Sequence, residues 1–270
     1  MSGTPVPLLE HATVVSNDRV CEGVGLVVLD APRVAASVRP GQFVHLRVGR
    51  DTPEILRRPF SVHRAANGRI EILYQVLGAG TLRLAEKKPG DTSMDLLGPL
   101  GRGWQVPEGT AHALLVTGGL GAAPLGMLAE ELAKRGVATV AAMGAPCGER
   151  ILARDLFERV CRRVEVATDD GSEGEHGFVT AVSGRLLRDE RFDVVYTCGP
   201  EPMQRIVVAQ AAEAGVQCQV SLERLMACGI GACLSCVVTT RSGLRRACVD
   251  GPVFDAEEVT FDATEIPPKH

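Results

Sequence analysis

Short apolar runs separated by turn residues characterise the first part of the chain. Residues 25–29, 43–48 and 70–76 are β-branched or alternate between apolar and polar positions, and Arg39-Pro40-Gly41 and Asn67-Gly68 supply turns between them. Alternation with a period of two residues is typical of half-buried strands. Short strands at this spacing predict an antiparallel β-barrel over residues 1–105.

The apolar pattern changes after residue 105. Strands and helices that alternate along a chain are typical of a parallel sheet covered by helices. The pattern therefore predicts a Rossmann-like α/β domain over residues 106–220. Its short apolar runs lie at 113–117, 137–143, 164–168 and 194–198, and its helix-like stretches lie at 125–135, 151–161, 179–187 and 201–213.

The last stretch, residues 221–270, is short, has little periodicity and is rich in cysteine. A segment this small does not bury a sufficient core alone, and a metal centre would compensate for that. The predicted fold class is thus multidomain β plus α/β: an antiparallel barrel, a Rossmann-like parallel domain and a small C-terminal metal domain.

Composition narrows the classes of function. The 270 residues are 45% apolar and 23% charged, an ordinary globular mixture. A net charge of -4 without blocks of like charge argues against nucleic acid and anionic membranes as partners. No apolar stretch reaches membrane-spanning length, and the N-terminal residues do not form a secretory signal. We therefore expect a cytoplasmic protein.

Four of the nine cysteines crowd together near the C-terminus with the spacing C-x4-C-x2-C-x11-C. This spacing matches the plant-type [2Fe–2S] pattern, in which each tetrahedral iron takes two thiolates beside two bridging sulfides. Small residues between the first two cysteines suit a loop whose N–H groups approach the sulfurs. The pattern predicts a [2Fe–2S] cluster with four protein ligands. These are Cys228, Cys233, Cys236 and Cys248.

Two alternatives to an iron–sulfur cluster are structural zinc and ordinary buried thiols. Zinc sites usually show C-x2-4-C pairs separated by a longer spacer, whereas here three cysteines share one glycine-rich loop. The five remaining cysteines are scattered, and buried core thiols are the ordinary interpretation for them. The histidines form no close-spaced pair, so none is assigned to a metal or to catalysis.

The run Arg57-Arg58-Pro59-Phe60-Ser61 begins a predicted strand and resembles the flavin motif of the ferredoxin–NADP reductase superfamily, Arg-x-(Tyr/Phe)-Ser. The resemblance implies that Arg58 pairs with the flavin pyrophosphate, and that Phe60 and Ser61, next to Pro59, lie against the isoalloxazine. On this motif alone, the ordinary start of a strand is an equal alternative.

Three further segments favour bound FAD. The next strand, Leu73-Tyr74-Gln75, lines the flavin in the superfamily, and the run from Asp95 to Gly101 resembles the turn that closes its barrel. Gly80 and Thr81 open a helix-like stretch, where backbone donors and the positive end of the helix dipole favour a phosphate.

Two glycine-containing motifs indicate a pyridine nucleotide. The first follows a strand, opens a helix and resembles the Gly-x-Gly-x-Ala-Pro loop of the superfamily, although it is not G-x-G-x-x-G. The second resembles the Cys-Gly-Pro-x-x-Met motif that lies beside the nicotinamide, with a buried strand-end thiol as the alternative for its cysteine. The residues concerned are Gly118, Gly119, Gly121, Ala123 and Pro124 in the first motif, and Cys198, Gly199, Pro200 and Met203 in the second.

Asp169 and Asp170 follow the strand that ends at Thr168. An acid at such a strand end can accept hydrogen bonds from ribose hydroxyls and repels a 2′-phosphate. We therefore predict NAD(H) rather than NADP(H), with Asp169 as the ribose-binding residue.

The order of barrel, nucleotide domain and cysteine cluster covers nearly the whole chain, and its details resemble the dihydroorotate dehydrogenase electron-transfer subunit family. That family more often shows Ser-Leu-Glu-Glu-Arg-Met, from which Arg224-Leu225 departs. The matching segments are residues 168–172, 177–180, 221–233 and 250–254.

The resemblance implies an electron relay in pyrimidine biosynthesis. An FMN-containing catalytic subunit, in a heterotetramer with two copies of each chain, would oxidise dihydroorotate and pass single electrons to the [2Fe–2S] cluster. FAD would collect two electrons and deliver a hydride to NAD+, with Cys198 and Ser61 shaping the nicotinamide–flavin contact. The alternatives are a reductase subunit for another partner, such as a hydrogenase or a ferredoxin-linked complex, and a zinc-stabilised binding module without redox activity.

Overall fold

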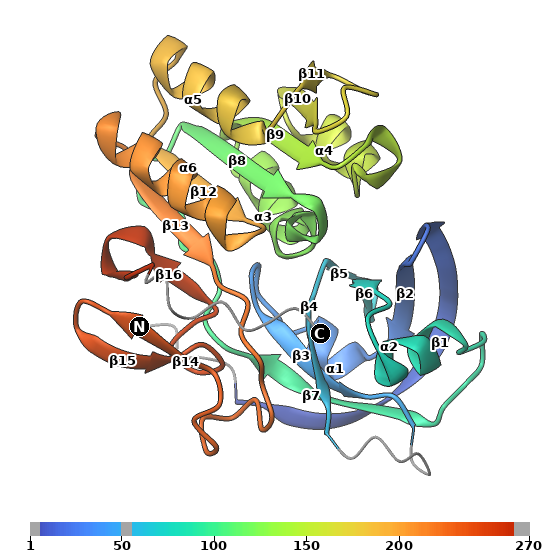
Figure 1. Ribbon diagram of the computed structural model, residues 1–270. Helices are drawn as coiled ribbons and strands as arrows, with labels where there is room; N and C mark the ends of the chain where they lie inside the picture. Colours follow the sequence, from blue (N-terminus) through green and yellow to red (C-terminus); the bar gives the residue numbers. More distant parts are fainter. Residues whose placement is uncertain (1–5, 50–55, 262–270) are drawn as a thin grey trace.

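The computed structural model describes residues 6–49 and 56–261. Residues 1–5, 50–55 and 262–270, which the predicted first and third domains include, lie outside the described residues. Two sheets dominate the structure, and the C-terminal segment lies beside both of them (Figure 1). In the described residues no helix is long and apolar enough to cross a membrane.

The first sheet is antiparallel and curved, in the strand order β4-β3-β7-β1-β2-β6-β5. Its concave side is filled by alternate apolar residues such as Val27 and Leu29, and Ile70 and Ile72, which are fully buried. This is the predicted barrel, with a long first strand that the apolar pattern does not predict. The elements are β1 (Leu8–Cys21), β2 (Val24–Asp30), α1 (Pro32–Ala35), β3 (Phe43–Arg47), β4 (Arg58–Ser61), β5 (Arg64–Ala66), β6 (Arg69–Gln75), α2 (Ala79–Ala85) and β7 (Met94–Leu100).

The second sheet has the strand order β11-β10-β9-β8-β12-β13-β16 and is parallel except at one edge. Helices lie over both of its faces, so the predicted Rossmann-like architecture is confirmed. Its parallel part contains β8 (His112–Gly118), α3 (Ala122–Lys134), β9 (Ala138–Ala145), α4 (Arg154–Val160), β10 (Arg163–Thr168), β11 (Glu175–His176), α5 (Val179–Asp189), β12 (Val194–Cys198), α6 (Glu201–Glu213) and β13 (Gln217–Ser221), with 3-10 turns at Gly119–Gly121 and Gly148–Arg150.

Strand β8 shows how one apolar run serves two cores. Leu114 and Val116 pack with residues of α5 and α6, whereas Ala113 and Leu115 pack with residues of α3 and α4. Successive side chains of a strand point to opposite faces, so a strand covered on both sides must be continuously apolar. This explains why the strand appears in the sequence as an unbroken apolar run.

The C-terminal segment completes the second sheet. Strand β16 (Val253–Asp255) pairs antiparallel with β13, so two strands of this sheet, β13 and β16, lie beyond the four apolar runs identified in the sequence. Pairing of this kind covers an otherwise open sheet edge. It joins residues more than thirty positions apart, and local periodicity carries no signal for such a contact. A 3-10 turn, Ala256–Glu258, follows β16.

The cysteine-rich segment also contains a hairpin of β14 (Val237–Thr240) and β15 (Gly243–Arg246). Val238 and Ala247 at this hairpin, together with Cys236 and Cys248, belong to the same apolar core as the α5–α6 face of the second sheet. The segment therefore shares a core with its neighbour, in agreement with the expectation that it could not build one alone. The domain boundaries themselves stay a prediction.

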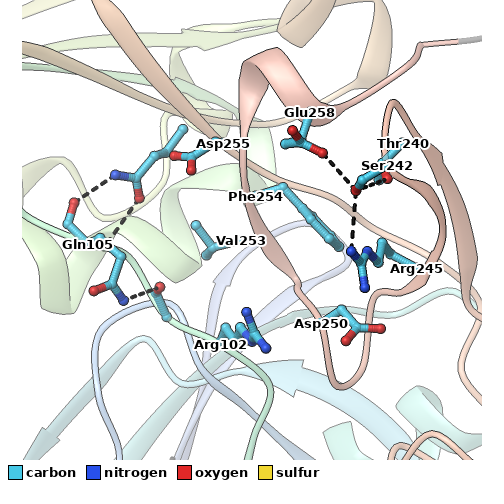
Figure 2. A pocket seen from close by; sticks show the side chains of 12 residues that line it. Arg102, Gln105, Thr240, Ser242, Arg245, Asp250, Val253, Phe254, Asp255 and Glu258 are labelled. Atoms are coloured by element: carbon cyan, nitrogen blue, oxygen red, sulfur yellow. Dashed lines mark hydrogen bonds between the residues drawn. The ribbon is translucent and has the colours of Figure 1, made fainter. Parts of the chain in front are cut away.

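Residues 102–105 connect the two sheets and meet the C-terminal segment. The backbone N–H of Gln105 donates to Gln219 Oε1 at 3.0 Å, and Gln219 Nε2 donates back to the Gln105 carbonyl at 2.8 Å. Figure 2 shows these bonds at the border of a cavity of about 580 Å³, whose other wall is the β14–β15 hairpin. There Ser242 joins Glu258 to Arg245 by hydrogen bonds. On this side of the cavity, hydrogen bonds thus join the β14–β15 hairpin to the turn that follows β16.

Candidate functional site

A cavity of about 490 Å³ lies between the barrel, the start of α3 and the segment after β13. Its lining combines the guanidinium groups of Arg58 and Arg224 with several apolar surfaces, which fits a group that carries phosphate and a flat apolar ring. Sequence-predicted residues from both sides meet here. From the barrel these are Arg58, Pro59, Phe60, Ser61, Leu73, Gln75, Gly80 and Thr81, and from the second sheet they are Ala123, Pro124 and Cys198.

Arg58 reaches across the first turn of α2. A Cβ atom at position 80 would lie 2.3 Å from Arg58 Nε, so a glycine there gives the guanidinium its place. The Thr81 hydroxyl is used within the turn, because it accepts the N–H groups of Leu77 and Gly78 at 2.9 and 3.1 Å. Arg58 therefore offers this wall of the cavity a positive charge of the kind that a pyrophosphate requires.

Tyr74 is not placed in this cavity. Leu73 and Gln75 line it, whereas the Tyr74 ring is buried in the barrel core and its hydroxyl donates to Asn17 Oδ1 at 2.9 Å. Neighbouring residues of a strand face opposite sides of the sheet, so three consecutive positions of β6 do not all face one cofactor. The expectation that Tyr74 lines the flavin is corrected accordingly: its ring supports the wall, in edge contact with Phe60 at 6.4 Å between centroids.

A second cavity, of about 580 Å³, opens at the carboxyl ends of the parallel strands. This is the usual ligand position in open α/β sheets. The glycine loop after β8 and the segment after β12 form its floor, with Leu77 and Gln75 of the barrel at one side. The sequence-predicted residues found here are Gly118, Gly119, Gly121, Asp169, Gly199, Pro200 and Met203.

Close backbone approach explains two of these glycines. A Cβ atom at position 121 would lie 2.0 Å from the Cys198 carbonyl oxygen, and one at position 118 would lie 2.7 Å from Met203 Sδ. The glycine loop and the Cys-Gly-Pro-x-x-Met segment are therefore in direct contact. The two motifs, about eighty residues apart in the sequence, act as one surface.

The two adjacent aspartates after β10 differ in their surroundings. Asp170 accepts hydrogen bonds from the backbone N–H and the hydroxyl of Ser172, at 2.9 and 2.6 Å, which hold the pKa of its carboxyl below the usual range. Asp169 instead lines the second cavity. Asp170 therefore shapes the loop, and Asp169 faces the space where a ribose would lie.

Cys198 lies at the end of β12 in the wall of the first cavity. Burial, with a smaller contribution from Glu223, raises the pKa of its thiol far above the usual range. The thiol is therefore neutral at physiological pH, and the position offers a polarizable S–H rather than a charge to the cavity. A neutral group of this size suits contact with a nicotinamide ring.

The four sequence-predicted cluster ligands come together as two pairs. Cys228 and Cys233 are in side-chain contact, and so are Cys236 and Cys248, while Cys248 also lies within electrostatic reach of Cys228. Two thiolates on each iron are what a [2Fe–2S] cluster requires.

The loop between Cys228 and Cys233 already points backbone donors at sulfur. The N–H groups of Ala232 and Cys233 donate to Cys228 Sγ at 3.3 and 3.4 Å, while Gly229 and Gly231 have φ values of 71° and 82°. Left-handed φ values of this kind favour glycine. The loop therefore has the small residues and N–H···S contacts expected of a cluster site.

The two cysteine pairs have opposite surroundings. Hydrogen bonds from Ser235 lower the pKa of the exposed Cys233 thiol to about 6, which favours the thiolate. Burial and the adjacent Cys236 raise the pKa of Cys248 to about 12. Ionising both members of the buried pair requires positive charge between them, and iron supplies that charge when a cluster is bound.

Sequence reasoning did not assign residues 221–226 to a cofactor site, although they were part of the family resemblance. They line the first cavity, and Glu223 also borders the second. Three further lining residues were not predicted. Phe43 lines the first cavity, Arg150 lines the second, and Leu120 lines both. The contiguous motif from Ser221 to Met226, which is part of the family resemblance, could have indicated that residues 221–226 line a cofactor cavity.

Known proteins share this combination of features. The family model for the iron–sulfur cluster binding domain of dihydroorotate dehydrogenase B matches residues 223–260. The dihydroorotate dehydrogenase B (NAD(+)) electron transfer subunit of Desulforamulus reducens is 39% identical over 239 residues, 86% of this chain and 91% of that protein. The same subunit of Bacillus caldolyticus is 40% identical over 93% of this chain and 98% of that protein.

A solved structure has the same architecture over nearly the whole chain. An NADH-dependent reduced ferredoxin–NADP oxidoreductase, studied for flavin-based electron bifurcation, is 33% identical, with a TM-score of 0.85 over 97% of this chain and 92% of that chain. The fold and the three sites define an iron–sulfur flavoprotein reductase of the ferredoxin–NADP reductase superfamily. Within it, the chain belongs to the family of dihydroorotate dehydrogenase B (NAD(+)) electron transfer subunits.

Membership confirms the predicted family and the predicted cofactor set of FAD, a [2Fe–2S] cluster and NAD. It also favours the oxidoreductase over the zinc-stabilised binding module. The Arg224-Leu225 departure lies in the wall of the first cavity, where Arg224 forms an ion pair with Glu201 at 3.3 Å. In this chain the ion pair thus joins the segment to the start of α6.

Proposed function

We propose that this chain carries electrons between an FMN-containing dihydroorotate dehydrogenase catalytic subunit and NAD+, through its [2Fe–2S] cluster and FAD, in pyrimidine biosynthesis. One observation carries the proposal. The first cavity is bordered at once by the barrel, by Cys198 of the nucleotide sheet and by residues 221–226, which lead directly into the cluster loop. A flavin in it therefore touches the segments that hold both of its electron partners.

The bound flavin supplies the exchange between two-electron hydride transfer and single-electron transfer. The chain's own residues bind and orient. Arg58 would hold the pyrophosphate, Phe60 and Ser61 would lie against the ring, and the glycine loop would hold the nucleotide at the end of β8. No side chain is required as a general base, because the reaction in this chain moves a hydride and electrons.

The cluster loop is the proposed exit toward the partner. Cys233 is exposed, and the exposed large apolar side chains around it are Leu225, Ile230 and Leu234. Exposed apolar groups around a redox centre are suited to a protein partner, which also excludes water from the electron path. We assign this surface to the catalytic subunit, in an assembly with two copies of each chain.

Two further assignments belong to the same proposal. Asp169 in the nucleotide cavity favours NAD(H) over NADP(H), because a carboxylate repels a 2′-phosphate. None of the nine cysteines, all of which lie in the described residues, forms a disulfide, in keeping with the reducing cytoplasm.

The test is a coupled assay on the chain co-purified with its partner from native lysate. We expect an FMN protein in the complex and NAD+ reduction that depends on dihydroorotate. A complex that reduces NAD+ with reduced ferredoxin or hydrogen but not with dihydroorotate would overturn the proposal in favour of a reductase for another partner.

The roles of Ser61 and Cys198 have their own test. Both line the flavin cavity, from opposite domains. Replacing each by alanine is expected to slow NADH-to-FAD reduction about 10-fold in stopped-flow measurements, the loss expected when positioning of two reactants is relaxed. Unchanged rates in both variants would contradict a role at the nicotinamide–flavin contact.

A further inference from the structure

His45 on β3 is fully buried, and neither ring nitrogen has a hydrogen-bond partner in the part of the chain that the structure describes. A buried polar group without a partner costs about 1–3 kcal/mol. A folded protein rarely keeps such a group without a use for it. The imidazole therefore calls for an explanation that the barrel does not provide.

The ring points at the cluster loop. A Cβ atom at position 229 would lie 2.8 Å from His45 Nδ1 and 3.1 Å from Cε1, so the ring fills the space that Gly229 leaves open. Gly229 follows the cluster ligand Cys228 directly, with a φ of 71°. The His45 ring thus lies against the tightest part of the loop that wraps the cluster.

The same face of β3 also reaches the flavin cavity. Phe43, two residues before His45, lines that cavity, and the two rings are in edge contact at 6.2 Å between centroids. Residues two apart on a strand share one face. Phe43 therefore borders the flavin cavity, and the neighbouring His45 ring borders the cluster loop.

Burial, helped by the nearby Arg57, keeps the ring neutral. Arg57 donates to the His45 carbonyl at 3.4 Å and forms an ion pair with Asp95, and burial, with Arg57 as the lesser cause, lowers the pKa of His45 to about 4. A neutral imidazole has one N–H donor. Cluster sulfurs are acceptors, and hydrogen bonds to them stabilise the reduced, more negative state.

We infer that His45 donates its ring N–H to a sulfur of the bound [2Fe–2S] cluster and thereby raises the cluster's reduction potential. His45 is a positioning and tuning residue: it keeps its proton while the cluster gains or loses one electron. The inference rests on the cluster of the proposed function, and it assigns the imidazole the partner that the protein itself lacks.

The test is an EPR-monitored redox titration of the holoprotein with His45→Phe and His45→Gln. The phenylalanine variant is expected to reduce the equilibrium constant for cluster reduction about tenfold, or about 59 mV for a one-electron couple. The glutamine variant keeps an N–H donor and should recover part of this. An unchanged potential in a fully loaded His45→Phe protein would overturn the inference.

A second measurement keeps the test decisive if the phenylalanine variant loses its cluster. In wild-type protein labelled with ¹⁵N-histidine, pulsed EPR should show a coupling between a histidine ring nitrogen and the reduced cluster. This coupling should be absent in His45→Gln. The exposed His112→Gln serves as the matched control and should retain it. A missing coupling refutes the role of His45 alone, whereas a protein without any EPR-active cluster refutes the proposed function as well.

Discussion

The start of α3 borders the proposed flavin and nucleotide cavities, and the cluster loop carries the predicted iron–sulfur ligands, but the two regions are held together differently. At the start of α3, Trp104 Nε1 donates to the Pro124 carbonyl at 2.8 Å, and the buried His63 ring bonds the Ala123 carbonyl at 3.1 Å. Arg64 of the barrel adds an ion pair with Glu130 at 2.8 Å. The cluster loop instead leaves Cys233 and its apolar neighbours exposed.

The difference reflects what each region must do. Hydride transfer requires two rings at a fixed separation, so the barrel and the nucleotide sheet are joined by buried hydrogen bonds around the glycine loop. In the proposed relay the cluster loop admits a partner protein, and the cluster itself would provide much of the loop's organisation. Changes at α3 should therefore alter nucleotide binding and stability, and changes at the loop should disconnect the chain from its partner.

The largest effect is expected from Cys228→Ser. A serine is a poor ligand for iron, so the cluster should be lost, and dihydroorotate-dependent NAD+ reduction by the complex should fall by at least about 100-fold. NADH oxidation with a small artificial acceptor should stay within about twofold, because Cys228 forms none of the hydrogen bonds that join the barrel to the start of α3. The measurement is steady-state kinetics with both acceptors on protein of known iron content.

The control for this variant is Cys161→Ser, a scattered cysteine in the nucleotide domain that is outside the cluster loop. It should retain iron and both activities. If Cys228→Ser lost both activities equally, the loop and the α3 region would be one unit, and the contrast between them would be wrong.

The second effect tests the α3 side. In Gly121→Ala, the new Cβ would lie 2.0 Å from the Cys198 carbonyl oxygen, so the backbone of one motif must shift. We expect KM for NADH to rise by at least about tenfold, equivalent to about 1.4 kcal/mol. The iron content and the cluster EPR signal should be unchanged.

The matched substitution is Gly184→Ala in α5, where the added Cβ would lie 2.8 Å from Nε2 of Gln210, a side chain hydrogen-bonded to Thr180 and Ser183. Since this glycine lines neither cavity, KM for NADH should stay near the wild-type value even if the protein is destabilised. An equal rise in both variants would show that general destabilisation, not contact between the two motifs, causes the effect.

The same contrast explains which parts of the molecule the sequence predicted well. Buried parallel strands such as β8 and β12 are short apolar runs, and they were predicted within one or two residues. The cluster ligands follow a spacing that the chemistry of two irons imposes. Features that depend on chain segments far apart were not predictable: the pairing of β16 with β13, and the contact of Gly229 with His45. Tyr74 is different, since a strict reading of strand alternation would have placed its ring away from the cavity.

The smallest effect concerns acid and the α3 region. The His63 ring is buried, and because its Nδ1 bonds a carbonyl, that nitrogen carries the proton of the neutral tautomer. Burial is the main cause that lowers the pKa of His63; Arg64 also lowers it, while the bond to Ala123 and the charge of Glu130 oppose the change. The folded protein thus resists a second proton on this ring.

The sign of the pH effect follows from proton linkage. In the unfolded chain a histidine has a pKa of about 6.5, so below that pH the unfolded state takes up a proton that the folded state refuses. The free energy of unfolding should then fall by up to about 1.4 kcal/mol per pH unit from this residue, down to its lowered pKa in the folded protein. Above pH 6.5 the contribution is constant.

His63→Gln removes this titration while keeping an amide donor for the Ala123 carbonyl. Thermal unfolding of the holoprotein between pH 5 and 7 should therefore show a shallower loss of Tm with acid in the variant than in the wild type. The exposed His112→Gln should keep the wild-type slope. Parallel slopes for all three proteins would mean that acid acts elsewhere, and the buried bond at the start of α3 would then not distinguish that region from the cluster loop.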